Sequence, residues 1–227
     1  MKFKSLYAGL IFSLASVGSN AQTLIVPGSA NVWLAGMPNG ATASADRAPE
    51  QSPVLFDVPD LGAGGYLTFS ATGSTAQGPG YALSGPDGGS VSGHSYGAEN
   101  GIAASSLPFM GLIGVFLSDQ QPNLTAAPAA LNSSVVGKDF TSFSAQLKQP
   151  FFIGDGTTSS GVSQLFYVPA SATRLFLGTA DGWGWYNNVG QLTVNVTAVP
   201  TPANALVMVM GLGVLSFARR FKRNKMH

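Results

Sequence analysis

The sequence lacks cysteine and contains few charged residues, and both shortages restrict its chemistry. Its 227 residues include no cysteine, so disulfide scaffolds, thiol catalysis and cysteine-ligated metals are excluded. Charged residues make up 9% of the chain, against about a quarter of an average globular protein. Residues 22–198 hold four lysines and arginines against ten acidic residues, a net charge of −6. Nucleic acid is therefore not expected as a partner, because phosphate binding needs clustered cations.

The N-terminus has the order of features that is typical of a secretory signal peptide. Lys2 and Lys4 precede an apolar run over residues 6–17, and a Ser-Asn-Ala sequence then ends at Ala21. We expect cleavage after Ala21, so that the signal peptide covers residues 1–21. The alternative is a retained membrane helix, which is less favoured because the apolar run is too short to span a bilayer well.

The C-terminus joins a proline-flanked turn to an apolar run and a basic tail. Residues 203–218 are apolar, and five lysines and arginines follow in residues 219–225. At about 1.5 Å rise per residue the apolar run reaches roughly 24 Å, short of the ~30 Å hydrocarbon core. We expect a marginal transmembrane anchor, because arginine snorkelling covers part of the difference. Its basic tail is expected in the cytoplasm, which places the middle of the chain outside it. A buried core helix is the alternative, which the five cations disfavour.

Pro200, Thr201 and Pro202 open this ending, and Arg219 and Arg220 begin its basic cluster. The three-part layout resembles the PEP-CTERM sorting signal of Gram-negative bacteria. The resemblance implies a transmembrane helix within residues 199–227 that tethers the protein to the inner membrane. It also implies processing by an exosortase-like enzyme and association with exopolysaccharide. Thr201 stands where the family has glutamate, which bears on processing if the enzyme reads that carboxylate.

Residues 22–198 have the pattern of one all-β domain. Short apolar runs alternate with glycine, proline, serine and asparagine. Leu192, Val194 and Val196 alternate with polar residues, as in a strand buried on one face. We predict a β-sandwich with jelly-roll-like connectivity, interrupted by two long segments at 73–101 and 118–149. The predicted strands cover residues 30–34, 53–58, 66–71, 112–117, 150–153, 164–168, 174–179 and 191–197.

Few residues could support catalysis. The chain has two histidines, and His227 lies in the basic tail, which leaves His94 as the candidate base. A loop histidine without a chemical role is the more common case. No pattern marks the pair of carboxylates that glycoside hydrolysis normally needs, and no glycine pattern follows a strand as in a phosphate-binding loop. We therefore predict no catalytic residues and no enzymatic activity.

Three polar residues lie in one loop between the last two predicted strands. Asp181, Asn187 and Asn188 offer side-chain oxygens, and calcium takes six to eight oxygens from carboxylates, amides and backbone carbonyls. Asparagine tolerates left-handed backbone conformations, so a turn can direct both amides inward. The alternative is that these residues are simply good turn formers.

The same loop is rich in aromatic residues. Trp183, Trp185 and Tyr186 have flat amphipathic faces that are suited to packing against a sugar ring. On composition alone, turn-forming polar residues and core aromatics are the favoured explanation. The residues therefore leave two interpretations open, a calcium and sugar site or a structural turn.

Three segments of this half of the domain carry a resemblance. Phe-Phe-Ile-Gly-Asp-Gly occupies residues 151–156, Leu-Phe-Tyr-Val-Pro occupies 165–169, and an Arg-Leu-Phe-Leu-Gly run begins the segment 174–196. Together they resemble the C-terminal half of the galactose-specific, calcium-dependent bacterial lectins of the LecA type. The resemblance implies a small β-sandwich in which calcium bridges the protein and sugar hydroxyls.

The same resemblance implies roles for individual residues. Asp181, Asn187 and Asn188 match the acidic ligand and the Asn-Asn ligand pair of these lectins. Gln77, in Gln-Gly-Pro, matches a residue that offers its main-chain carbonyl to the metal. His94 could take the place of a histidine that contacts the sugar. The loop from Asp181 to Asn187 is one residue shorter than in the family.

Three functions are weighed for the exported domain. The first is a non-catalytic, calcium-dependent carbohydrate-binding module associated with extracellular polysaccharide. The second is a structural surface or matrix protein without a small ligand. The third and least favoured is an enzyme that acts on polysaccharide.

Overall fold

A computed structural model describes residues 20–61, 63–94, 97–132 and 136–201. The predicted leader up to residue 19 and the predicted anchor from Pro202 onward lie outside the described residues. The first two residues of strand β1 (Asn20–Pro27) belong to the predicted signal peptide. Within the described ranges, no helix is both long and apolar enough to cross a membrane.

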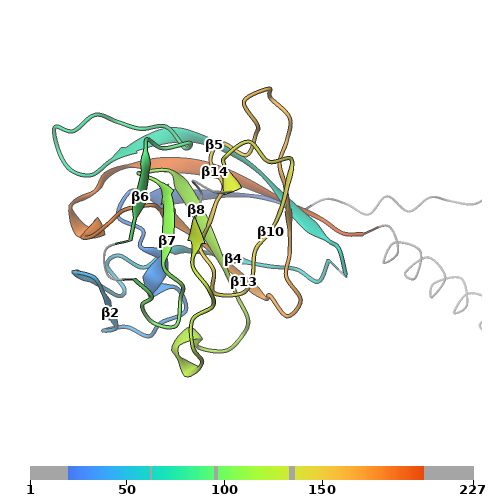
Figure 1. Cartoon of the computed structure of the whole chain (residues 1–227), viewed down its shortest axis with the longest axis horizontal. Helices are drawn as coiled ribbons and strands as arrows, with labels where there is room; N and C mark the ends of the chain where they lie inside the picture. Colours follow the sequence, from blue (N-terminus) through green and yellow to red (C-terminus); the bar gives the residue numbers. More distant parts are fainter. Residues whose placement is uncertain (1–19, 62, 95–96, 133–135, 202–227) are drawn as a thin grey trace, which may run out of the picture. The chain divides into compact units, whose positions relative to one another are not determined.

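The described chain is all-β, with two larger sheets and two small ones (Figure 1). Neighbouring strands in the larger sheets are antiparallel, except for β10 beside β12. The five-stranded sheet has the order β1, β14 (Val189–Val199), β5 (Tyr66–Ala76), β12 (Leu165–Tyr167) and β10 (Ser142–Ser144). The four-stranded sheet has the order β11 (Phe151–Phe152), β8 (Leu112–Leu117), β13 (Arg174–Thr179) and β4 (Val54–Asp57). The small sheets pair β2 (Thr42–Ala43) with β3 (Asp46–Arg47), and place β7 (Ser105–Pro108) between β6 (Val91–Gly93) and β9 (Leu131–Asn132). The described residues also form three short 3₁₀ helices, η1 (Val32–Leu34), η2 (Pro122–Leu124) and η3 (Trp185–Asn187).

The two larger sheets face each other across one hydrophobic core, which makes the domain a β-sandwich. The alternating residues Leu192, Val194 and Val196 of β14 are buried, and they share this core with Phe116 of β8 and Leu175 of β13. Each such side chain contributes about 1.5–3 kcal/mol when it leaves water. The predicted all-β class with several sheets is confirmed, while the jelly-roll connectivity stays a prediction.

A second core covers the outer face of the four-stranded sheet. Strand β8 is buried along its whole length, because its alternate residues enter different cores. Ile113 and Val115 pack in the second core with Trp33 of η1 and Trp185 of η3. A strand covered on both faces reads as a continuous apolar run rather than an alternating one. The second core therefore ties helix η3 and its loop to the sheet.

Most predicted strands are observed, and one is wrong. The strand predicted at residues 30–34 is not observed, because Val32–Leu34 form helix η1. The physical reason is the side chain of Asn31, which accepts the Trp33 backbone N–H at 2.9 Å and so offers the chain a local alternative to a strand ladder. The two long segments also hold short elements that the pattern does not predict, namely β6, η2, β9 and β10.

Strand register defines two opposite ends of the domain. Strand β1 runs antiparallel to β14, with Asn20 opposite Ala198 and Pro27 opposite Gln191. The described chain thus enters beside the place where it leaves, at the right in Figure 1. There Thr201 donates its backbone N–H to Leu61 O at 3.2 Å. The loop before β14 lies at the other end, together with the loop that follows β5.

Candidate functional site

The register of β5 and β14 brings two predicted ligand loops together. Ala76 pairs with Val189, so Gln77 follows one strand where Asn188 precedes the other. Gly78 confirms the close approach, because a Cβ there would lie 3.8 Å from Asn187 O. The structure therefore places Gln77, Asn187 and Asn188 at one end of the same strand pair.

Asn188 holds its amide in a fixed orientation with its oxygen unsatisfied. The side chain is 8% exposed, and Nδ2 donates to Gly28 O at 3.1 Å. Oδ1 is buried and has no hydrogen-bond partner among the described residues. A buried acceptor without a partner costs about 1–3 kcal/mol. Such an oxygen is suited to coordinate a cation or to accept a hydrogen bond from a ligand.

The carbonyl of Gly28 joins the two strands that lead into this loop. It accepts the hydroxyl of Thr179 at 2.7 Å and the amide of Asn188 at 3.1 Å. Glycine is required at this position because a Cβ would lie 2.7 Å from Val189 O. The end of β13 and the start of β14 are therefore fixed to one point, which positions Asp181 two residues beyond Thr179.

Asp181 is buried, and one of its carboxylate oxygens already accepts hydrogen bonds from its own loop. Its Oδ1 accepts the backbone N–H groups of Gly182 at 2.5 Å and Trp183 at 3.3 Å. Its Oδ2 makes no hydrogen bond with the described residues. Asn187 is exposed, whereas Gln77 is half-buried. The site thus offers one carboxylate, two side-chain amides and a main-chain carbonyl. In the described part of the chain, no three His, Cys, Asp or Glu side chains are grouped so that they could hold a metal. A site here would therefore depend on amide and carbonyl oxygens as well as on the carboxylate.

Asp46 supports the loop that carries the site, although no motif in the sequence points to it. It is 1% exposed, Oδ1 accepts the N–H of Tyr186 at 2.9 Å, and Oδ2 accepts that of Trp185 at 3.0 Å. Asn31 Nδ2 donates to the same Oδ2 at 2.9 Å. Burial raises the pKa of Asp46 and the nearby negative charge of Asp181 adds to this, against the lowering effect of the three hydrogen bonds. Asp46 lies in a short segment between turns, where no spacing or motif marks it.

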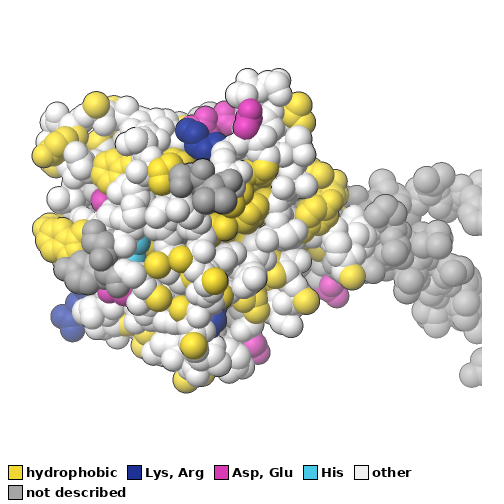
Figure 2. Space-filling model, viewed as in Figure 1, with side chains coloured by type: hydrophobic (Ala, Val, Ile, Leu, Met, Phe, Trp, Pro, Cys, Tyr) yellow, Lys and Arg dark blue, Asp and Glu magenta, His cyan; other side chains and the backbone are white. Residues whose placement is uncertain are grey.

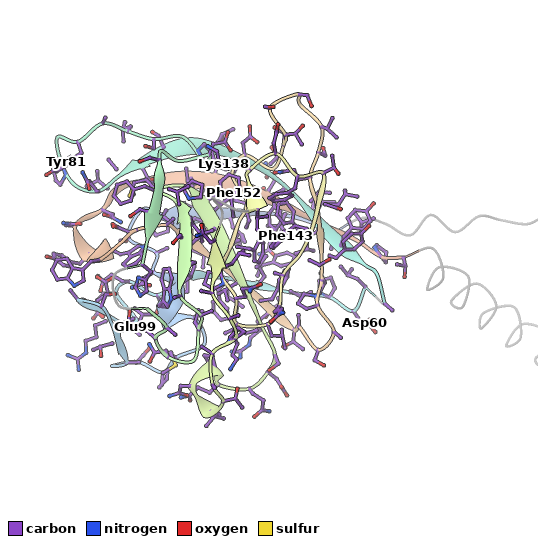
Figure 3. The ribbon with its side chains drawn as sticks, viewed as in Figure 1. Asp60, Tyr81, Glu99, Lys138, Phe143 and Phe152 are labelled. Atoms are coloured by element: carbon purple, nitrogen blue, oxygen red, sulfur yellow. The ribbon has the colours of Figure 1, made fainter. Side chains whose placement is uncertain are left out.

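The aromatic residues of the loop divide into exposed and buried ones. Trp183 and Tyr186 are 45% and 53% exposed, and their rings meet edge to face with centroids 6.1 Å apart. Tyr81 is also exposed, and its ring lies 3.4 Å from the Cβ position of Gly78. Hydrophobic side chains are visible at this end of the molecule in Figure 2, and Tyr81 is labelled there in Figure 3. Trp185 is fully buried, and its Nε1 donates to Thr179 O at 2.8 Å. The predicted sugar contact of Trp185 is therefore corrected to a core position.

His94 is also a core residue. Its side chain has no exposed surface, and Nε2 lies 2.7 Å from Glu99 Oε2. The imidazole stacks on Trp33 with ring centroids 3.7 Å apart. The predicted sugar contact of His94 is corrected for the same reason as that of Trp185, since a ring enclosed by tryptophan offers no face to a ligand. Figure 3 labels Glu99, which accepts this bond at the margin of the second core.

Glu99 is held as a charged group. Burial raises its pKa, but the hydrogen bonds from His94 and from the backbone amide and hydroxyl of Ser44 outweigh this effect, so the pKa is lowered. The Ser44 bonds measure 2.7 and 2.9 Å. The Glu99 carboxylate therefore ties the turn at Ser44 to the segment that carries His94.

The predicted sorting residues are described only in part. Pro200 and Thr201 continue from β14, and Thr201 is fixed to Leu61 as stated above. Pro202, Arg219 and Arg220 lie outside the described residues. Their predicted roles stay predictions.

A polar hollow of about 520 Å³ lies elsewhere on the domain. Lys138, Asp139 and Asp155 line it together with Asp87, and Figure 2 shows cationic and acidic atoms side by side at the upper edge, where Figure 3 labels Lys138. Asp139 accepts the N–H and hydroxyl of Ser159, which lower its pKa. One oxygen of Asp155 likewise accepts two bonds from Thr157. These carboxylates are therefore explained by the turns that they stabilise.

Comparisons with known proteins identify no family. No family model matches the chain, and no curated protein matches it. A solved structure described as "EclA N-terminal domain; PllA-like lectin" matches with 16% identity and a TM-score of 0.31, over 78% of this chain and 94% of that one. At this TM-score the likeness assigns neither a ligand nor a site.

Proposed function

We propose that this chain is an exported, non-catalytic, calcium-dependent carbohydrate-binding protein associated with extracellular polysaccharide. The observation that carries the proposal is the buried, unpartnered Oδ1 of Asn188. Its amide nitrogen is already committed to Gly28, so the side chain cannot turn to satisfy the oxygen without losing that bond. A cation is a chemically suitable partner because calcium accepts amide oxygens as ligands.

The residues that would hold calcium are Asp181, Asn187, Asn188 and the carbonyl of Gln77. Four protein oxygens are fewer than the six to eight that calcium takes, which leaves positions for sugar hydroxyls. When bound, the ion would attract and coordinate hydroxyl oxygens of the sugar through its positive charge. Trp183 and Tyr186 would offer apolar faces beside it.

The placement of the site fits a tethered protein. Strand β14 leads from the site at Val189 to Val199, a path of about 34 Å at the usual strand rise. A membrane anchor beyond Thr201 would thus hold the domain by the end opposite to the site. The proposal keeps the predicted tether, the inner membrane and an exosortase-like enzyme as partners.

Titration calorimetry of the full-length chain, in a detergent without a sugar headgroup, tests the proposal. Calcium should bind, and a galactoside or the native polysaccharide should then bind only in its presence. Asn188→Ala and Asp181→Asn should weaken both events. Asn195→Ala is the matched control, because Asn195 is an exposed asparagine of β14 far along the strand from the loop. A wild-type chain without a calcium response would refute the proposed mechanism.

A structural surface or matrix protein is the second candidate. It is favoured by the burial of Trp185 and His94 and by the two backbone bonds that Asp181 accepts from its own loop. On this alternative calcium stabilises the loop without creating a sugar site. A calcium-dependent rise in Tm with no binding of any glycan would support it, and turnover of a glycan would support the least favoured alternative, an enzyme.

A further inference from the structure

Helix η3, which ends at the proposed ligand Asn187 and is followed by Asn188, has no side-chain cap from its own N-cap residue. The N-cap residue is Gly184, with φ 76°, and it provides no side-chain hydrogen bond. The first backbone N–H groups of any helix have no partner within the helix and need one elsewhere. In η3 these groups belong to Trp185 and Tyr186.

Asp46 supplies the missing cap from a distant part of the sequence. Each of its two carboxylate oxygens accepts one of these N–H groups, at 2.9 and 3.0 Å. The carboxylate is held in turn by Asn31, which is also fully buried. Asn31 is itself fixed because its Oδ1 accepts the N–H of Trp33. A rigid buried path thus runs from helix η1 to helix η3.

The charge of Asp46 also acts on the site. The described residues form no ion pair with it, and the titratable group that faces it is Asp181, whose negative charge disfavours that of Asp46. Two carboxylates near one loop, without a cationic side chain between them, are stabilised together when a cation binds at Asp181.

We infer that Asp46 is the positioning residue of the proposed calcium site. It holds the first two residues of helix η3 so that Asn187 and Asn188 present their oxygens, and it adds negative charge behind them. This inference rests on the proposed function. Groups that orient metal ligands in this way typically change metal affinity by about 10–100-fold when they are mutated.

The test is Asp46→Asn in the full-length chain. Asparagine has nearly the same volume but one acceptor oxygen, so it cannot accept both N–H groups as the carboxylate does. Calcium should bind about 10–100-fold more weakly in calorimetry. In the calcium-free protein, hydrogen exchange should accelerate at the amides of residues 185 and 186 while β14 keeps its protection.

Two control variants separate positioning from general loss of stability. Val194→Ala weakens the main core away from the site, and it should lower Tm with an unchanged calcium Kd. Asp57→Asn removes an exposed charge on β4 and should change neither. If Asp46→Asn does not fold, Asn31→Ser replaces it, since serine can still cap Trp33 but cannot donate to Asp46 as the amide does. Asn31→Ser should weaken calcium binding several-fold.

The outcomes are distinct. Weaker calcium binding beyond that of Val194→Ala, with faster exchange in η3, supports the inference. A folded Asp46→Asn or Asn31→Ser variant with the wild-type Kd overturns it and leaves the proposed function intact. A wild-type chain that binds no calcium overturns both.

Discussion

At the scale of single residues, burial decides which aromatic side chain can meet a ligand. Trp185→Phe removes the indole N–H and leaves the buried Thr179 carbonyl without this donor. The free energy of unfolding should fall by about 1–3 kcal/mol. Trp183→Ala, at an exposed position, should change it by less than about 0.5 kcal/mol but weaken glycan binding. Urea unfolding and calorimetry of both variants check this. Equal stability of the two variants would contradict the core position of Trp185.

Glu99 gives a prediction about pH. Its pKa is lowered from the ordinary value of 4.5, so its stabilising effect is fully present above that value and is lost as pH falls through the lowered pKa. Glu99→Gln should therefore lose about 1–2 kcal/mol of unfolding free energy at pH 7. The difference from wild type should shrink below pH 4.5. Denaturant titrations across this range test it, and a difference that does not depend on pH would be evidence against the charged hydrogen bond.

The predictability of the site also differs from residue to residue. Asp181 and the Asn-Asn pair can be recognised in the sequence as candidate calcium ligands, because they offer oxygen atoms within one loop. The exposure of each aromatic residue is not visible, because a turn formed by Gly184 directs one tryptophan outward and the next inward. Asp46 could not be predicted, since its three partners come from Asn31 and from residues about 140 positions away.

At the scale of elements, strand β8 depends on a glycine in a tightly packed part of the main core, beside Phe151, Ile153 and Leu175. A Cβ at Gly114 would lie 2.9 Å from a methyl carbon of Ile153 and 3.0 Å from the Phe151 ring. Gly114→Ala should therefore destabilise the domain by about 1–3 kcal/mol through overpacking. Gly85→Ala is the control, because nothing lies within 4 Å of its Cβ position. Thermal unfolding of both compares them, and a neutral Gly114→Ala would mean that the core can adjust.

The sequence predicts strands well where the pattern reflects burial. Strand β13 matches its predicted range of 174–179, and β14 contains the alternation that identified it. Strand β1 is missed because its first residues resemble the end of a signal peptide. Helix η1 is mistaken for a strand because its apolar residues are buried either way, and the hydrogen bond by which the Asn31 side chain caps the helix leaves no periodic pattern. Short edge strands such as β10 have too few residues to show any period.

At the scale of the whole molecule, the predicted export sets the environment in which the site could work. The absence of cysteine permits a direct test, since any introduced cysteine is the single reactive thiol. Asp119→Cys places one on an exposed part of the domain, and His227→Cys places one in the predicted cytoplasmic tail. In spheroplasts, a membrane-impermeant maleimide should label Asp119→Cys at once, because the domain is expected beyond the inner membrane. His227→Cys should be labelled only after lysis if the tail is retained, and intact mass shows whether it is. Labelling of Asp119→Cys that also requires lysis would place the domain in the cytoplasm, where extracellular polysaccharide could not reach the loop from Asp181 to Asn188.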